Sequence, residues 1–235
     1  MGSVFRFKEF EVNQQGCAMK INTDGVLLGA TVHTSNPSHI LDIGTGTGVI
    51  ALMLAQRFQH AQVDAVEIDA DAYQTSLKNF KQSPFSSRIC GNLGSFENLD
   101  VANKYDLIVS NPPFYTNSLH NPDARKKLAR HTDFDFFDKI ITFANTNLSD
   151  NGQLELILPV ELAEYVIDKG SCQGLHLIKL IAIKSFSDSE VIRHIISLSR
   201  KTTEAVMKEE FVIYQEKGIY SEAYRTILKP YFLAF

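Results

Sequence analysis

Short apolar runs alternate with longer stretches of helical pattern along most of this 235-residue sequence, and this alternation limits the possible folds more than any other feature. Residues 39–43 (HILDI) and 104–110 (KYDLIVS) are typical of buried strands, whereas 47–58 and 69–82 place apolar side chains at helical spacing. Strands that alternate with helices of about a dozen residues predict βαβ units around a mostly parallel, doubly wound sheet.

The same pattern continues toward the C-terminus. Further strands are predicted at 62–68, 87–90 and 153–159, and further helices at 135–148 and 160–170. The last two apolar runs, 175–186 and 191–200, are joined only by SDSE and predict an antiparallel hairpin at the edge of the sheet. We therefore expect a Rossmann-like α/β fold, in which ligands bind beyond the carboxyl ends of the strands, near the point where strand order reverses.

Composition excludes several classes of protein. With 44% hydrophobic and 21% charged residues and a net charge of −4, the chain is not expected to coat nucleic acid through a uniformly basic surface, although a local basic patch remains possible. The apolar run at 49–55 is too short for a membrane span, and the N-terminus lacks the features of a signal peptide. Three widely separated cysteines suggest free thiols in a reducing cytoplasm, and no metal site is expected.

The first predicted strand ends in a glycine-rich turn, LDIGTGTG. Gly44, Gly46 and Gly48 permit a tight turn and the close approach of a ligand to backbone N–H groups. Asp42 precedes the turn, where a carboxylate repels a pyrophosphate but accepts hydrogen bonds from an ammonium group. The pattern therefore favours an amino-acid-bearing cofactor such as S-adenosylmethionine over a dinucleotide, with a purely structural βα turn as the alternative.

The next two strand ends also carry polar residues. Glu67 follows Asp42 by 25 residues, near the spacing at which an acid binds ribose hydroxyls in nucleotide-binding βαβ units, while Asp69 or Asp71 is a candidate helix cap. After the strand at 87–90, Asn92 is a candidate partner for the cofactor's adenine amine and Leu93 an apolar wall beside it. A polar loop without a ligand is an equally good interpretation of this third strand end.

The fourth strand end is SNPPF, residues 110–114. Two prolines end the strand and remove two backbone donors, so the turn is rigid and its carbonyls stay available. The side-chain oxygen of Asn111 and the carbonyl of Pro112 can accept hydrogen bonds from a planar amine, Pro113 stiffens the turn, and Phe114 can stack on a flat substrate. This arrangement favours chemistry at an exocyclic amine.

Together, LDIGTGTG, VEID and SNPPF resemble the class I S-adenosylmethionine-dependent methyltransferases that modify planar amines. The segments GCAMKINTDGVLLGA (16–30), ARHT (129–132) and YSEAYRTILKPYFLAF (220–235) further resemble the bacterial tRNA(Val) (adenine-37-N6) methyltransferases over nearly the whole chain. The resemblance implies a methyltransferase domain at 36–235 with an N-terminal extension, 1–35, on the cofactor site. It implies cofactor contacts by Lys20, Thr23, Asp24, Asp42, Gly44, Gly46, Gly48, Glu67, Ile68, Asn92, Leu93 and Asn111, and binding of the target adenine by Asn111, Pro112, Pro113 and Phe114.

A basic cluster follows the SNPPF motif, within ARKKLARH (124–131). Such a run is often only a solvated helix face, but its place after the catalytic turn favours contact with an RNA backbone. Its members are Arg125, Lys126, Lys127, Arg130 and His131.

The sequence thus predicts a cytoplasmic, monomeric tRNA adenine N6-methyltransferase. A glutamine methyltransferase acting on a release factor, an rRNA guanine N2 methyltransferase, and a cofactor-binding RNA scaffold with a degenerate site are the alternatives.

Overall fold

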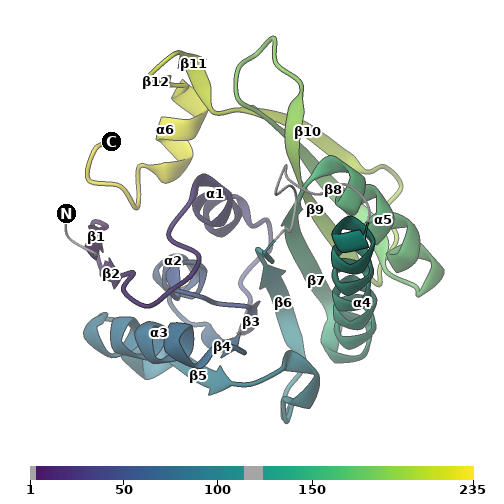
Figure 1. Cartoon of the computed structure of the whole chain (residues 1–235), viewed down its shortest axis with the longest axis horizontal. Coiled ribbons are helices and arrows are strands. Elements are labelled where there is room, and N and C mark those ends of the chain that lie inside the picture. Colours follow the sequence, from purple (N-terminus) through teal and green to yellow (C-terminus); the bar gives the residue numbers. More distant parts are fainter. Residues whose placement is uncertain (1–3, 114–123) are drawn as a thin grey trace.

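One large sheet organises the chain in the computed structural model, which describes residues 4–113 and 124–235, with the side chains described up to 113 and from 134 (Figure 1). The strand order is β10-β8-β9-β7-β6-β3-β4-β5. Its strands are β3 (His39–Ile43), β4 (Gln62–Glu67), β5 (Ile89–Leu93), β6 (Tyr105–Ser110), β7 (Leu148–Leu158), β8 (His176–Lys184), β9 (Val191–Ser199) and β10 (Met207–Val212). The run from β7 to β5 is parallel throughout, which confirms the predicted doubly wound α/β fold.

Helices cover both faces of this sheet (Figure 1). On one side α1 (Thr23–Thr31), α2 (Val49–Arg57) and α3 (Ala70–Gln82) pack together, and on the other side α4 (Ala124–Asn147) and α5 (Val160–Cys172). Ile40 of β3 belongs to the first core and Leu41 to the second, and neither is exposed to solvent. A strand buried on both faces needs continuous apolar residues, so the run HILDI was a reliable strand signal.

Small elements flank the sheet. Near the N-terminus, β1 (Val4–Arg6) and β2 (Glu11–Asn13) form a two-stranded sheet, and β11 (Tyr214–Glu216) with β12 (Ile219–Tyr220) forms another before α6 (Glu222–Leu228). The short 3₁₀ turns η1 (Ser86–Arg88) and η2 (Phe96–Asn98) flank β5. The two ends of the chain meet, since the Lys8 ammonium donates to the carbonyls of Lys229 and Phe235. Among the described residues, no helix combines the length and apolar character that crossing a membrane requires.

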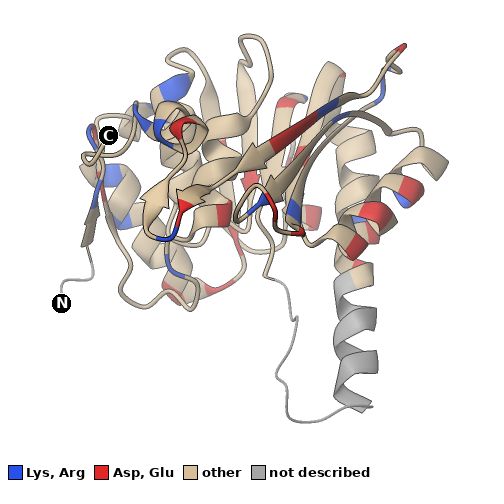
Figure 2. Cartoon of the chain, turned by 90° about the horizontal axis from the view of Figure 1, so that it is seen from above, with Lys and Arg blue, Asp and Glu red and all other residues tan. Residues whose placement is uncertain are grey.

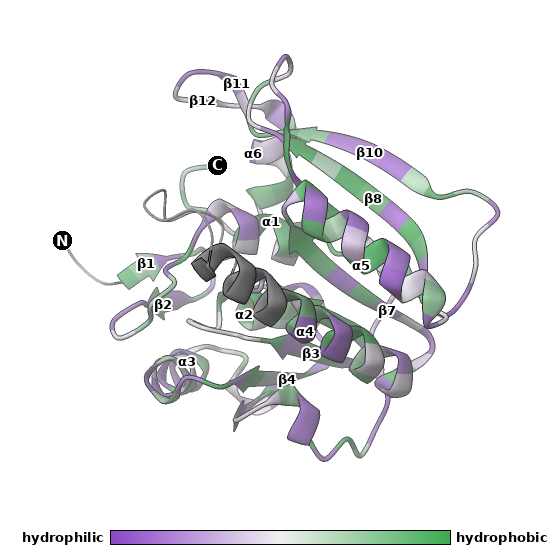
Figure 3. Cartoon of the chain, turned by 45° about the vertical axis from the view of Figure 1, so that its right-hand side comes forward, coloured by the Kyte–Doolittle hydropathy of each residue, from purple (hydrophilic) through white to green (hydrophobic). Residues whose placement is uncertain are grey.

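The predicted hairpin is confirmed, because β8 and β9 are antiparallel and β9 also pairs antiparallel with β7. An additional strand, β10, lies outside this hairpin and runs parallel to β8. The sequence pattern did not indicate β10, because half of its residues MKEEFV are charged and four of the six are exposed. Figure 3 shows the hydrophilic part of the strand. Lys179 and Lys184 of β8 form ion pairs with Glu209 and Glu210 of β10, with N–O distances of 3.2 Å.

Several predicted boundaries were wrong, and the helix predicted at 135–148 begins at Ala124 as α4. The strand predicted at 87–90 is observed as β5 and extends to Leu93. Gly91 lies within it, at a position where a Cβ would be only 2.6 Å from a methyl carbon of Leu77 on α3. Here the glycine permits close helix–strand packing rather than ending the strand. The turn predicted at 149–152 lies within β7 instead, as an irregularity between the Tyr105–Leu148 and Leu107–Gln153 pairs.

Candidate functional site

The predicted site residues gather where strand order reverses, between β3 and β6. The chain builds β3, β4 and β5 outward in one direction and then returns to place β6 on the other side of β3. Ile43 and Ser110 end these two strands as paired neighbours, and the buried Ser110 hydroxyl donates to the Ile43 carbonyl at 2.7 Å. The glycine-rich turn and the Asn-Pro-Pro turn therefore leave the sheet side by side, at the edge where such folds bind ligands.

The three glycines of the first turn differ in what surrounds them. All have positive φ angles, +71° at Gly44, +55° at Gly46 and +83° at Gly48. A Cβ added to Gly44 would meet nothing within 4 Å, so its backbone is open to a ligand. A Cβ on Gly48 would lie 2.4 Å from the ring of Phe80, so this glycine allows α2 to begin against α3. The open backbone at Gly44 and Gly46 fits a cofactor, whereas the position of Gly48 is explained by packing.

Asp42 is fully buried at the end of β3. Its Oδ2 accepts hydrogen bonds from the Thr45 hydroxyl at 2.7 Å and from the Ala51 amide at 3.2 Å, while Oδ1 has no partner among the described residues. Burial raises the pKa of this carboxyl to about 7, the two hydrogen bonds lower it, and the nearby charge of Glu67 raises it further. A cationic ligand group such as an ammonium would stabilise the ionised form of this acid, whose pKa burial raises to about 7, and would supply the missing partner of Oδ1.

Glu67 braces the glycine turn in a way that the sequence did not indicate. Its Oε2 accepts from the Gly46 amide at 2.8 Å, and its Oε1 accepts from the Asp69 amide at 2.9 Å. An ionised carboxylate offers about four lone-pair positions, so both oxygens still have room to accept ribose hydroxyls. Asp69 in turn caps α3 by accepting from the Ala72 amide at 2.8 Å, which confirms it as the helix cap.

Two exposed apolar side chains stand beside Glu67 at the strand ends. Ile68 is 75% exposed and Leu93 is 54% exposed, so both side chains are open to contact from solvent, and their contact with a cofactor remains a prediction. Leu93 is paired with Glu67 and therefore points to the same side of the sheet, whereas Asn92 is paired with Val66 and points to the other side. A cofactor contact by Asn92 remains a prediction.

The Asn-Pro-Pro turn follows β6. Asn111 is half-buried, Pro112 is buried and Pro113 is exposed. The Asn111 side-chain NH₂ donates to Oδ1 of Asn22 over 3.5 Å, so the N-terminal segment reaches this turn. Phe114 lies outside the described residues.

Asn22 was not among the predicted site residues, although an asparagine directly before a helix is a recognisable cap signal.

The first turn of α1 lies at the same edge of the sheet. Asp24 forms an ion pair with Arg193 of β9, with 2.9 Å between Oδ2 and Nε. Burial raises the pKa of the Tyr224 phenol on α6, and the hydrogen-bonded Thr23 side chain acts in the opposite direction. Lys20 is exposed. Thr23 and Asp24 therefore have structural partners, and cofactor contacts by them and by Lys20 remain predictions.

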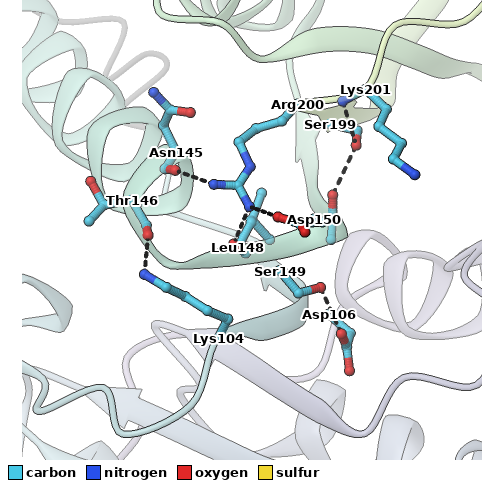
Figure 4. A network of polar contacts seen from close by, with 11 residues as sticks. Lys104, Asp106, Asn145, Thr146, Leu148, Ser149, Asp150, Ser199, Arg200 and Lys201 are labelled. Carbon is cyan, nitrogen blue, oxygen red and sulfur yellow. Dashed lines mark hydrogen bonds and ion pairs between the residues drawn. The ribbon is translucent and has the colours of Figure 1, made fainter.

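The predicted RNA-binding cluster at 124–131 stands at the start of α4, and its side chains lie outside the described part of the chain. Over the described elements, basic and acidic residues are interspersed (Figure 2). Arg200 and Lys201 are at the opposite edge of the sheet from the Asn-Pro-Pro turn, because β9 runs antiparallel to β7. There the Arg200 guanidinium donates to the carbonyls of Asn145 and Leu148 and pairs with Asp150 (Figure 4), which ties α4 to the sheet.

Comparison with known proteins gives close relatives along the whole chain. Residues 17–167 match the family model of the methyltransferase small domain. A protein of Pedobacter heparinus named tRNA1(Val) (adenine(37)-N6)-methyltransferase is 47% identical over 235 residues, which is all of both chains. Proteins of the same name from Flavobacterium johnsoniae and Trichodesmium erythraeum are 40% and 39% identical, covering 98% and 100% of this chain and 99% of each relative.

Solved structures agree on the fold. A predicted O-methyltransferase from Agrobacterium tumefaciens has a TM-score of 0.68 at 18% identity, covering 88% of this chain and 96% of that one. A methyltransferase from Pyrococcus furiosus has a TM-score of 0.58 at 21% identity, with 80% and 91% covered.

Proposed function

This chain belongs to the family of the tRNA1(Val) (adenine(37)-N6)-methyltransferases, and from that premise we propose that it methylates the N6 amine of adenine 37 in the anticodon loop of tRNA1(Val). S-adenosylmethionine is the methyl donor. The enzyme works as a cytoplasmic monomer without a metal. An unpaired loop base costs less to turn into a pocket than a base stacked inside a duplex.

The pairing of β3 with β6 is the structural observation that best supports this proposal. The strand that ends in the glycine turn is hydrogen-bonded to the strand that ends in the Asn-Pro-Pro turn, through the pair Ile43 and Ser110. A cofactor held at the first turn and an amine held at the second would therefore lie next to each other. Holding both reactants in this way replaces a bimolecular encounter by a positioned one.

The residues of the first turn suit the proposed cofactor. Asp42 would accept from its ammonium group through the unpartnered Oδ1, and Glu67 would accept from its ribose hydroxyls. Ile68 and Leu93 offer apolar surface to its adenine ring. S-adenosylmethionine, when bound, supplies a methyl group made electrophilic by a sulfonium sulfur.

The Asn-Pro-Pro turn holds the nucleophile. The lone pair of an adenine amine is delocalised into the ring, so the amine must be oriented toward the methyl group. The Asn111 side-chain oxygen and the Pro112 carbonyl would accept hydrogen bonds from the two N–H groups of the amine, and the prolines keep this geometry rigid. Transfer would then be a direct in-line displacement, in which the bond from the amine nitrogen to the methyl group forms as the bond from the sulfonium sulfur breaks. S-adenosylhomocysteine would leave, the surplus proton of the amine would pass to water, and no covalent bond to the enzyme would form.

Substrate recognition is assigned to segments beyond the cofactor site. The basic residues at 124–131 would contact the tRNA backbone, and Phe114 would stack on the target base. The extension at residues 1–35 would pack on the cofactor site, with Lys20, Thr23 and Asp24 near the methionine end.

The test offers radiolabelled S-adenosylmethionine to unmodified tRNA1(Val), to the same tRNA with guanine at position 37, to rRNA and to release factor. We expect label only in the first RNA. Label in the release factor alone identifies a glutamine methyltransferase, label in rRNA a guanine methyltransferase, and no label in any of them a cofactor-binding scaffold. Asn111→Ala should lower kcat at least about 100-fold, a loss comparable to that on removing one positioned hydrogen-bond donor from an active site, whereas the exposed, remote Asn151→Ala serves as the matched control.

A further inference from the structure

We propose that Asn22 is a positioning residue for the reaction: it holds the Asn111 amide with its oxygen turned toward the substrate amine. The proposal rests on the function proposed above and adds a residue from the N-terminal segment to it. An asparagine side chain has two nearly identical ends, and only its oxygen end can accept from an amine. Some group must therefore decide which way Asn111 points.

The orientation of Asn22 itself is determined by the backbone. Asn22 caps α1, and its side chain lies 2.8 Å from the amide nitrogen of Gly25. A backbone N–H can only donate, so the atom that faces it must be the side-chain oxygen of Asn22. The cap thus places a fixed acceptor at the start of α1.

This fixed acceptor then determines the orientation of Asn111. The Asn111 atom that faces Oδ1 of Asn22 is 3.5 Å away. If this atom were an oxygen, two hydrogen-bond acceptors would face each other without a hydrogen between them and would repel. The NH₂ end therefore belongs at this contact, and the oxygen end is left for the substrate. In the reversed orientation, Asn111 would point donor hydrogens at the donor hydrogens of the adenine amine.

The start of α1 is held firmly enough to act as such a reference. The Asp24–Arg193 ion pair, 2.9 Å long, joins it to β9. Further along, α1 approaches α2 so closely that a Cβ on Gly29 would lie 3.1 Å from the sulfur of Met53. Gly25 packs against this contact, since an added Cβ would lie 3.4 Å from both the Asn111 nitrogen and the Asn22 oxygen.

Three substitutions separate the positioning role from helix capping. Asn22→Asp keeps an acceptor for both Gly25 and Asn111, whereas Asn22→Ser keeps the cap but is too short to reach Asn111. Asn22→Ala loses both contacts. Because Asn22 is exposed and the contact to Asn111 is long, water competes with it, so we expect a modest effect: a kcat about five- to tenfold lower in Asn22→Ser and within about twofold of wild type in Asn22→Asp.

The experiment measures kcat and the KM values for cofactor and tRNA in steady state, together with thermal unfolding. A lower kcat with unchanged KM and an unchanged unfolding midpoint in Asn22→Ser, rescued in Asn22→Asp, supports the proposal. Equal kcat values in these two variants overturn it, as does a loss confined to the KM for the cofactor. A wild-type enzyme that leaves tRNA unmethylated refutes the proposed function instead, which keeps the two failures apart.

A second readout does not depend on turnover. The side-chain NH₂ signals of Asn111 in an amide NMR spectrum are assigned by their disappearance in Asn111→Ala. We expect them to shift in Asn22→Ser and to stay near their wild-type positions in Asn22→Asp. Signals that are unchanged in Asn22→Ser and Asn22→Ala overturn the contact, even if either variant is unstable at the assay temperature.

Discussion

The buried carboxyl of Asp42 should make cofactor binding depend on pH. Without a ligand its pKa is raised by burial from 3.8 to about 7, whereas a bound ammonium group favours the ionised form. Binding below pH 7 must therefore expel a proton from Asp42. The ammonium group of the ligand has a pKa near 7.7–8.0, so it stays protonated over the same range.

The size of the effect follows from the fraction of ionised Asp42. About three quarters of the molecules carry the ionised form at pH 7.5, but only about one in thirty at pH 5.5. Because roughly 60–75% of the ligand ammonium groups are protonated at pH 7.5 and nearly all at pH 5.5, the Kd should rise about 15- to 20-fold between these values. Asn cannot ionise, so Asp42→Asn should bind more weakly at pH 7.5 and change less than about twofold over the range. The difference between the two pH profiles isolates Asp42 from every other titrating group.

Isothermal titration calorimetry with S-adenosylhomocysteine provides the measurement, because this ligand keeps the ammonium group and cannot react. Repeating it at pH 6 in buffers of different ionisation enthalpy counts the protons released, and we expect about one for wild type and none for Asp42→Asn. A wild-type Kd that is flat from pH 5.5 to 7.5 would refute the reasoning. So would a pH dependence that survives in the variant.

Two further predictions concern the glycine turn and the sheet. Gly48→Ala should lower the free energy of unfolding in urea by about 2–4 kcal/mol, since its Cβ would lie 2.4 Å from Phe80 at a φ of +83°. Gly44→Ala should lower it by only about 1 kcal/mol and mainly weaken S-adenosylhomocysteine binding. Equal losses of stability in the two variants would contradict this. Burial raises the pKa of Glu155 to about 7, so the contribution of this acid to stability is lost as pH rises from about 4.5 through 7. Between pH 5 and pH 8, Glu155→Gln should therefore gain stability relative to wild type, by roughly 3 kcal/mol at most. A difference in unfolding free energy between the two proteins that does not change with pH would contradict this titration.

Much of the sheet was predictable because its strands are buried on both faces. Apolar residues predominate in the runs at 39–43 and 104–110, and each observed strand starts and ends within one residue of the prediction. The failures have local causes. Gly91 normally argues against a strand, but here it makes room for Leu77, and the charged residues of β10 carry no apolar alternation because that strand lies at the edge of the sheet.

The candidate site divides in the same way. The placement of Asp42, Glu67 and Asn111 at one edge of the sheet was predictable, because parallel strands bring their carboxyl ends to the same edge. Contacts between segments far apart in the sequence could not be predicted in this way. The bond from Asn111 to Asn22 spans 89 positions, and the carboxylate of Glu67 reaches back 21 positions to Gly46, so both contacts depend on tertiary packing.

The charged edge strand β10 has a consequence for the behaviour of the protein at high concentration. An outermost strand exposes backbone donors and acceptors that a second molecule can pair with, which is a common route to aggregation. On β10 such pairing would bring Glu209 and Glu210, each already matched with a lysine of β8, close to the same carboxylates of another copy. Repulsion between like charges opposes that approach. The two ion pairs thus attach β10 to β8. The glutamates of β10 at the same time oppose pairing between the sheet edges of two molecules.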